Sequence, residues 1–154
     1  MPDAIAPRDL QWLQRATDLS KSCPPSATAF SVGAMLVGDN DQVISTGYSR
    51  ENDPHNHAEE TALAKVSPDD PRLASATMYS TLEPCSKRSS HPVTCTQLII
   101  SAGIPRVVLA WREPTIFVDC EGVELLRAAN IDVVEIAEPA DEVKQINAHL
   151  LGTN

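Results

Sequence analysis

The sequence predicts an α/β fold in a single domain, in which a β-hairpin precedes a series of alternating strands and helices. Two short apolar runs, 30–37 and 42–48, flank the turn-forming residues 38–41 (GDND), as in a hairpin. From residue 76 onward strand and helix patterns alternate, which indicates parallel strand pairing with helices on the faces of the sheet. No repeat or linker divides the 154 residues, so we expect one domain over 1–154.

Each predicted element follows from the spacing of its apolar residues and from the residues that end it. The first helix, 8–22, carries leucines and a tryptophan at helical spacing and ends before Cys23 and two prolines. The segment 67–72, rich in Pro and Asp, is expected to form a loop. The further predicted helices are 57–65, 94–102, 120–129 and 141–151, and the further predicted strands are 76–81, 106–111 and 132–136.

The composition favours a small-molecule substrate over a nucleic acid or a membrane. A formal net charge of −9 opposes binding to a phosphate-rich polymer, and 4% aromatic residues leave little surface for stacking bases. No apolar run approaches the roughly 20 residues of a membrane span, and residues 1–7 lack the apolar core of a signal peptide. Four cysteines in such a chain favour reduced thiols or a bound metal over disulfides, so we expect a cytoplasmic protein.

Four residues form a pattern typical of a catalytic zinc site: His57, Glu59, Cys85 and Cys95. A structural zinc site fills all four positions with protein side chains, whereas His57, Cys85 and Cys95 supply only three and leave one for water. We therefore expect one Zn²⁺ per chain carrying a water or hydroxide. Glu59 is then the candidate catalytic residue, which moves protons between this water and a substrate.

The predicted elements allow these residues to meet. On a helix, the side chains of His57 and Glu59 would point about 200° apart, so one site can use both only if it lies over the helix N-terminus. Cys95 falls in the first turn of its helix, behind Thr94 as the expected cap. Cys85 follows a predicted strand, and sites in open α/β sheets form outside the carboxyl ends of strands.

Four segments carry a resemblance to a known family: HAEETAL, YSTLEPCSKRSSHPVTC, GIPRVVLAWREPTIF and ANIDVVEI. They resemble the cytidine/deoxycytidylate deaminase superfamily, whose zinc signature is H-x-E followed by P-C-x-x-C, and most closely its riboflavin-pathway pyrimidine deaminases. Here nine residues instead of two separate Cys85 from Cys95, and the run EPCSKRSS is similar to the fungal form of that family.

The resemblance implies a three-layer α/β/α sandwich with a central five-stranded mixed sheet, assembled as a homodimer. It places His57, Cys85 and Cys95 at the positions of zinc ligands and Glu59 at the position of the proton shuttle. The implied reaction is hydrolytic deamination of a small aminopyrimidine-type substrate, in which a carbonyl replaces the amine and ammonia is released.

Two departures from the family leave two kinds of substrate open. The bacterial riboflavin enzyme carries a reductase domain, for which 154 residues are too few. Ser49 stands where free cytidine deaminases usually have an asparagine that binds ribose. The substrate is therefore expected to be either a riboflavin-pathway diaminopyrimidine phosphate or a free base of the cytosine, guanine or aminotriazine kind.

Candidate substrate contacts come from segments near the zinc motif. Lys87 and Arg88 could hold a substrate phosphate, and the backbone around Ala58 could orient the ring. The candidates are Phe30, Glu51, Asn52, Ala58, Lys87, Arg88, His91 and Trp111. Two rival functions remain. One is a deaminase acting on tRNA or single-stranded DNA, which the net charge opposes, and the other is a non-catalytic zinc-binding scaffold, which would leave Glu59 unexplained.

Overall fold

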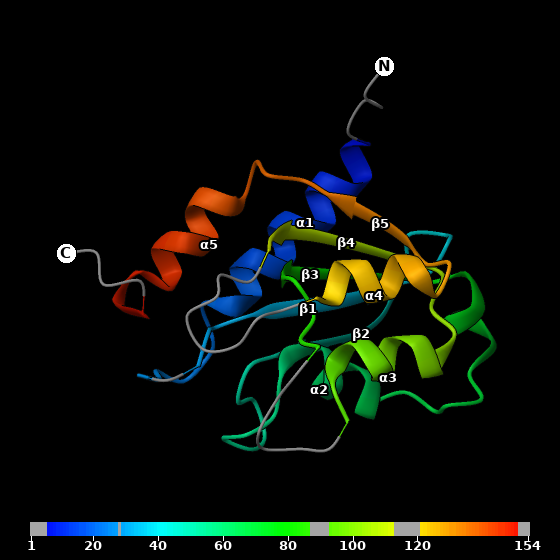
Figure 1. The fold of residues 1–154 in the computed structure, drawn as a ribbon, viewed down its shortest axis with the longest axis horizontal. Coiled ribbons are helices and arrows are strands. Elements are labelled where there is room, and N and C mark those ends of the chain that lie inside the picture. The colour runs from blue at the N-terminus through cyan, green and yellow to red at the C-terminus, as the bar shows by residue number, and fades with distance from the viewer. Residues whose placement is uncertain (1–5, 28, 87–92, 113–120, 151–154) are drawn as a thin grey trace.

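A five-stranded mixed sheet forms the centre of the protein, in the computed structural model that describes residues 6–27, 29–86, 93–112 and 121–150. The strand order is β2-β1-β3-β4-β5, with β1 antiparallel to both β2 and β3, and with β3, β4 and β5 parallel (Figure 1). The strands are β1 (Gly33–Val37), β2 (Val43–Tyr48), β3 (Thr77–Leu82), β4 (Arg106–Trp111) and β5 (Asp132–Glu135). The predicted hairpin and the predicted parallel pairing are both confirmed.

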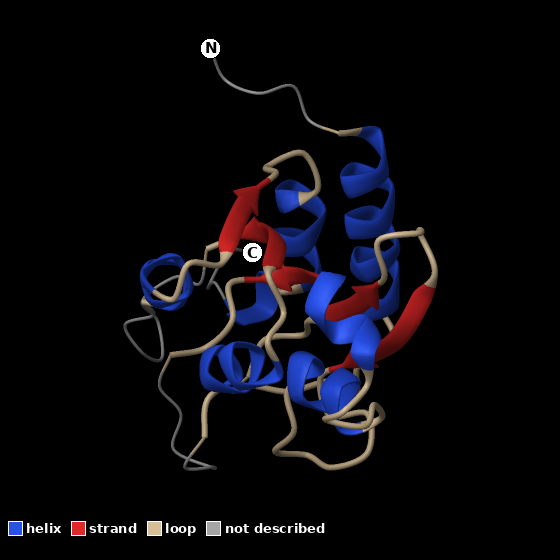
Figure 2. Ribbon diagram, turned by 90° about the vertical axis from the view of Figure 1, so that its right-hand side faces the viewer, coloured by secondary structure: helices blue, strands red, loops and turns tan. Residues whose placement is uncertain are grey.

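Helices cover both faces of the sheet, which gives the predicted three layers (Figure 2). The helices are α1 (Pro7–Ser20), α2 (Ala58–Ala64), α3 (Cys95–Ala102), α4 (Gly122–Ala128) and α5 (Ala140–Ile146). Tyr79 and Val108 point from the sheet into one core with α1 and α5, whereas Met78 and Val107 point into the other core with α2, α3 and α4. This division follows from the alternation of side chains along a strand.

Several boundaries differ from the predicted ones, most clearly at residues 30–32, at 67–75 and after Ile146. Residues 30–32 lie outside β1, because the side chain of Asn147 pairs with the backbone of Ser31 in place of a neighbouring strand. The expected loop 67–72 runs into a 3-10 helix, Pro71–Ser75, whose first turn is capped by Asp70. The last helix ends at Ile146 instead of residue 151, and a 3-10 turn, Ala148–Leu150, follows it.

A buried polar cluster attaches α1 to the sheet. Asp9 accepts hydrogen bonds from both terminal nitrogens of Arg106, at 2.8 and 2.5 Å, and from the hydroxyl of Tyr79 at 2.6 Å. We call Asp9, Tyr79 and Arg106 the Asp9 clamp. The hydrogen bonds from Arg106 lower the pKa of Asp9 below its ordinary value, although burial opposes them.

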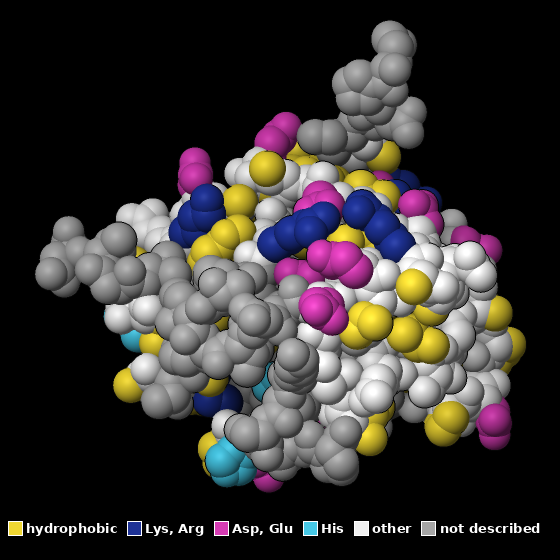
Figure 3. Space-filling model, viewed as in Figure 1, with side chains coloured by type: hydrophobic (Ala, Val, Ile, Leu, Met, Phe, Trp, Pro, Cys, Tyr) yellow, Lys and Arg dark blue, Asp and Glu magenta, His cyan; other side chains and the backbone are white. Residues whose placement is uncertain are grey.

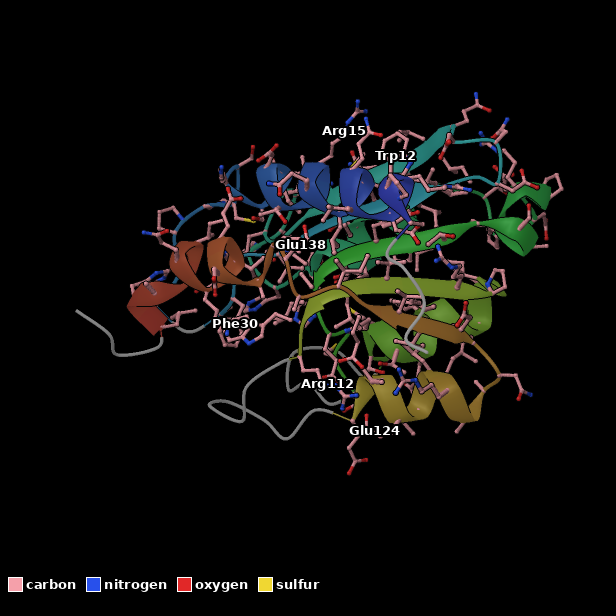
Figure 4. The ribbon with its side chains drawn as sticks, turned by 90° about the horizontal axis from the view of Figure 1, so that it is seen from above. Trp12, Arg15, Phe30, Arg112, Glu124 and Glu138 are labelled. Carbon is pink, nitrogen blue, oxygen red and sulfur yellow. The ribbon has the colours of Figure 1, made fainter. Side chains whose placement is uncertain are left out.

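The edge of the sheet at β5 is bridged to the neighbouring strand and helix by surface ion pairs. Arg112 pairs with Glu135 at 2.7 Å and lies 3.5 Å from Glu124 of α4 (Figure 4). On the face in Figure 3, basic and acidic side chains accordingly lie side by side over α4 and β5. No helix within the described ranges is long and apolar enough to cross a membrane.

Candidate zinc site

The structure brings His57, Cys85 and Cys95 together from three separate elements. Their ligand atoms all lie within 4.8 Å of one another. His57 is the N-cap of α2, Cys95 is the first residue of α3, and Cys85 follows the end of β3. Both cysteines are buried and the histidine is half-buried. The cluster therefore lies where two helix N-termini meet the carboxyl end of a parallel strand.

Local hydrogen bonds explain why the two helices begin at these residues. The backbone N–H of His57 donates to Glu60 Oε1 at 2.6 Å, so the side chain of Glu60 closes the start of α2. At α3, Thr94 and Gln97 form a reciprocal capping box, with distances of 2.9 and 3.2 Å. The predicted cap at Thr94 is confirmed, and it fixes the first turn that carries Cys95.

The start of α3 also holds Cys85 in place. Thr96 donates to the carbonyl oxygen of Cys85 from its backbone nitrogen at 3.1 Å and from its hydroxyl at 2.7 Å. The backbone N–H of Cys95 donates to Cys85 Sγ at 3.2 Å, and Cys95 Sγ lies 3.4 Å from His57 Nδ1. These contacts hold Cys85 against the start of α3 and place Cys95 beside the imidazole of His57.

The ionisation of Cys85 suits a metal ligand. The hydrogen bond from the Cys95 thiol is the largest cause of a lowered pKa of Cys85, about 4, and His57 adds to the effect although burial opposes it. At neutral pH Cys85 is therefore a thiolate. Two sulfur atoms and one imidazole nitrogen at these separations form a donor set that fits Zn²⁺ at three of its four positions.

The turn that carries Cys85 is also supported by α4, and the sequence analysis missed this support. The carboxylate of Glu83 accepts a hydrogen bond from Val123 N at 2.9 Å, and Glu83 N donates to Trp111 O at 2.9 Å. A Cβ on Gly122 would lie 2.1 Å from Pro84 O, so only glycine permits this approach. The sequence signal available for Glu83 was its place two residues before Cys85.

Glu59 lies in the first turn of α2 and is buried, with 4% of its surface exposed. Within the described residues, its side-chain hydrogen-bond partner is Ser80 of β3, whose Oγ is 3.2 Å from Glu59 Oε2. Burial is the main reason that the pKa of Glu59 is raised to about 7, and the Cys85 thiolate raises it further. A carboxyl group with this pKa can both hold and release a proton at neutral pH.

Two of the candidate substrate contacts form an aromatic pair near the carboxyl ends of the strands. Phe30 is buried and meets Trp111, at the end of β4, edge to face with 5.9 Å between ring centroids. Figure 4 shows Phe30 on the same side of the molecule as α5, and Lys144 of α5 lies 5.8 Å from the Trp111 ring. Ala58 is buried as the first residue of α2, directly after His57.

The remaining candidates have other surroundings or lie outside the described residues. The carboxylate of Glu51 accepts hydrogen bonds from Lys65 at 2.7 Å and from Tyr48 N at 3.3 Å. Asn52 is exposed. The hydroxyl of Ser49 is buried and accepts a hydrogen bond from Val32 N at 2.9 Å. The three candidates outside the described residues are Lys87, Arg88 and His91.

Fold and site together define an α/β/α domain in which three nitrogen and sulfur donors that could hold a metal ion lie next to a buried carboxyl group. Residues 7–111 match the family model described as the cytidine and deoxycytidylate deaminase zinc-binding region. The chain belongs to this family, which confirms the resemblance, the fold and the zinc cofactor predicted from the sequence.

Curated relatives show the branch of the family to which the chain is similar. A diaminohydroxyphosphoribosylamino-pyrimidine deaminase from Schizosaccharomyces pombe is 48% identical over 127 residues, which are 81% of this chain and 31% of the relative. A riboflavin biosynthesis protein RibD from Aquifex aeolicus is 36% identical over 143 residues, which are 90% of this chain and 37% of the relative. The chain thus spans about a third of the length of these relatives.

The solved structures to which this chain is similar include a Rib2 deaminase and a RibD. Aspergillus oryzae Rib2 deaminase, a C-terminal deletion mutant in complex with DARIPP, gives a TM-score of 0.78 at 30% identity, and the match covers 90% of this chain and 89% of that one. Acinetobacter baumannii RibD gives a TM-score of 0.77 at 31% identity, over 94% of this chain and 39% of that one. A dCMP deaminase from cyanophage S-TIM5, at 19% identity and a TM-score of 0.64 over 86% of this chain and 100% of that one, shares the fold.

Proposed function

We propose that this chain is a zinc-dependent deaminase that hydrolyses an amino group of a diaminopyrimidine carrying a ribosyl phosphate. The observation that carries the proposal is the buried carboxyl group of Glu59, whose pKa of about 7 suits proton transfer, beside three side chains that fit Zn²⁺. A non-catalytic scaffold would need no such carboxyl group, and burying one in an apolar site is costly.

His57, Cys85 and Cys95 are the proposed zinc ligands, and Glu59 is the proposed catalytic residue. Zinc bound there supplies a Lewis acid that makes a water molecule nucleophilic near neutral pH. Glu59 takes a proton from the attacking water and delivers it to the substrate, so that the amine departs as ammonia. The ring carbon exchanges its C–N bond for a C=O bond, and one water is consumed for each ammonia released.

The similarity to named relatives supports a ribosylaminopyrimidine phosphate over a free base. The S. pombe relative at 48% identity is a diaminohydroxyphosphoribosylamino-pyrimidine deaminase, and the Aspergillus structure is a complex with DARIPP. In the proposal, Phe30 and Trp111 border the ring, and the cationic side chains of Lys87 and Arg88 hold the phosphate. Because the net charge of the chain is −9, a phosphate needs such local cations.

The proposal also covers the domain organisation, the oligomeric state and the location of the enzyme. Residues 1–154 act as one deaminase domain, in a homodimer, on a small cytoplasmic substrate rather than a nucleic acid. The negative net charge and the low aromatic content of the sequence support the small substrate.

Ammonia release from a panel of substrates tests the proposed function. Zinc-loaded protein is assayed with the diaminopyrimidine ribosyl phosphate, its dephosphorylated form, cytidine, dCMP, cytosine, guanine and single-stranded DNA. We expect release from the phosphate ester, a higher KM for the dephosphorylated form, and loss of this difference in Lys87→Ala with Arg88→Ala. Release of ammonia from a free base alone would show that the substrate is a free base instead of the ribosyl phosphate. Silence across the panel with one zinc bound would overturn the enzyme assignment.

A further inference from the structure

Ser80 is a polar residue on an otherwise apolar face of the central strand β3. Met78 and Leu82, two positions before and after it on the same face, both belong to the core beneath α2, α3 and α4. Ser80 itself is 0% exposed. A buried hydroxyl group is costly unless it is hydrogen-bonded, so the two partners of Ser80 decide what it does there.

The hydroxyl of Ser80 has two acceptors within reach and only one proton to donate. The carbonyl oxygen of Leu82 is 2.7 Å from Ser80 Oγ, and Glu59 Oε2 is 3.2 Å away. When Glu59 is a carboxylate, the hydroxyl can turn toward it and donate. Ser80 Oγ therefore lies between the backbone of its own strand and the carboxyl group of Glu59.

We propose that Ser80 is a positioning residue, which holds the carboxyl group of Glu59 in one orientation through the contact between Ser80 Oγ and Glu59 Oε2. The inference rests on the proposed function, because it assigns Ser80 to the reaction that Glu59 performs. Ser80 is the side-chain partner that the described part of the chain offers Glu59. Alanine would leave the carboxyl group without this partner, and a buried acid so released has other rotamers to occupy.

A purely structural role makes a different prediction. If Ser80 only caps the carbonyl of Leu82 near the strand end, its removal should lower stability and leave turnover of the folded enzyme unchanged. Thr81 offers a matched control on the same strand. Its buried hydroxyl faces the other way along the strand alternation and accepts a hydrogen bond from Gly33 N at 3.2 Å, away from Glu59.

The test compares Ser80→Ala, Ser80→Thr and Thr81→Val in the zinc-loaded full chain. We expect Ser80→Ala to lower kcat about tenfold or more, as losses of supporting hydrogen bonds at metal sites do, with KM within about twofold and one zinc retained. Ser80→Thr, which keeps the hydroxyl, should regain most of kcat, and Thr81→Val should keep kcat while losing thermal stability. Equal kcat in Ser80→Ala and the wild type, or no recovery in a cooperatively folding Ser80→Thr, would overturn the proposal.

A second readout separates this inference from the proposed function. The carboxyl ¹³C resonance of Glu59, assigned by its absence in Glu59→Gln, is recorded at one pH for the zinc-loaded variants. We expect it to move or broaden in Ser80→Ala and to stay unchanged in Thr81→Val. An unchanged resonance in Ser80→Ala would contradict the positioning role even if no substrate in the panel releases ammonia. Silence of the wild type in the panel would instead count against the proposed function alone.

Discussion

Two buried carboxyl groups bind to opposite faces of strand β3, through neighbouring residues of that strand. Asp9, 2% exposed, accepts hydrogen bonds from Tyr79 and from both terminal nitrogens of Arg106. Glu59, 4% exposed, meets the hydroxyl of Ser80, which it shares with a backbone carbonyl. The pKa of Asp9 is lowered by its hydrogen bonds to Arg106, whereas the pKa of Glu59 is raised to about 7 by burial.

The two carboxyl groups differ in how well the protein compensates their charge. A carboxylate with a paired guanidinium stays ionised and contributes to stability, but it has no affinity for a proton at neutral pH. A carboxyl group with few partners is costly to bury, yet its proton affinity matches proton transfer. Burial alone therefore does not indicate function, and the decisive property is how well the charge is compensated.

Zinc removal should give the largest effect and should affect only one of the two faces. Chelation is expected to reduce ammonia release to background, and added Zn²⁺ should restore it. The Asp9 clamp lies on the other face, so unfolding of the metal-free protein should remain cooperative. Metal analysis, the ammonia assay and circular dichroism check this expectation. Full turnover with less than a tenth of a zinc per chain would contradict it.

Substitution of Asp9 should lower the stability of the protein and leave its turnover nearly unchanged. Asp9→Asn leaves Arg106 without its buried partner, and we expect a loss of about 2 to 3 kcal/mol in the free energy of unfolding, less than for a fully buried pair because Arg106 is partly exposed. Turnover at a temperature where the variant is folded should change less than twofold. Asp132→Asn is the control, since Asp132 is exposed and lies 3.6 Å from Arg106. Urea unfolding measures the stability of both variants. A loss of unfolding free energy in Asp132→Asn as large as in Asp9→Asn would contradict the account.

The contribution of the clamp should also depend on pH with a definite sign. The pKa of Asp9 in the folded protein lies below the ordinary value of 3.8, because the folded state stabilises the carboxylate. Its stabilising contribution is therefore complete above pH 3.8 and is lost as the pH falls through the lowered folded value. The difference in unfolding free energy between wild type and Asp9→Asn should be constant from pH 8 to 5 and should shrink at pH 3. A constant difference down to pH 2 would contradict this.

A smaller effect is expected at Asn147, which links α5 to the proposed substrate side of the site. Its amide accepts from Ser31 N at 2.7 Å and donates to Ser31 O at 3.2 Å, next to Phe30. Asn147→Ala should cost about 1 to 3 kcal/mol of stability, because the backbone of Ser31 loses its partner. A severalfold rise in KM with little change in kcat should accompany this loss. Gln145→Ala, on the exposed side of α5, is the control, and an equal KM in both variants would contradict the link.

The parts predicted from the sequence are those encoded by short-range patterns. The hairpin turn at 38–41, the apolar spacing of the helices and the cap at Thr94 each depend on residues only a few positions apart. The grouping of His57, Cys85 and Cys95 followed from ligand chemistry and from the tendency of strand ends to form sites.

The parts that were missed depend on contacts between distant segments. Asn147 lies 116 positions after Ser31 and pairs with its backbone as a neighbouring strand would. Nothing near Asn147 in the sequence indicates this pairing. The sequence predicted Ser80 only as a residue of a strand, because its hydrogen bond with Glu59 forms only once α2 packs on β3. Thr96 supports the Cys85 carbonyl from the next helix, which spacing alone does not predict.

The most direct test of the account is the turnover of Glu59→Gln, measured with its zinc content and its unfolding free energy. The substitution keeps the shape of the side chain but removes its ability to carry a proton back and forth. We predict one zinc per chain, a free energy of unfolding no lower than that of the wild type, and a kcat lowered by about 10²- to 10⁴-fold. A Glu59→Gln protein that binds zinc and releases ammonia at the wild-type rate would contradict the account.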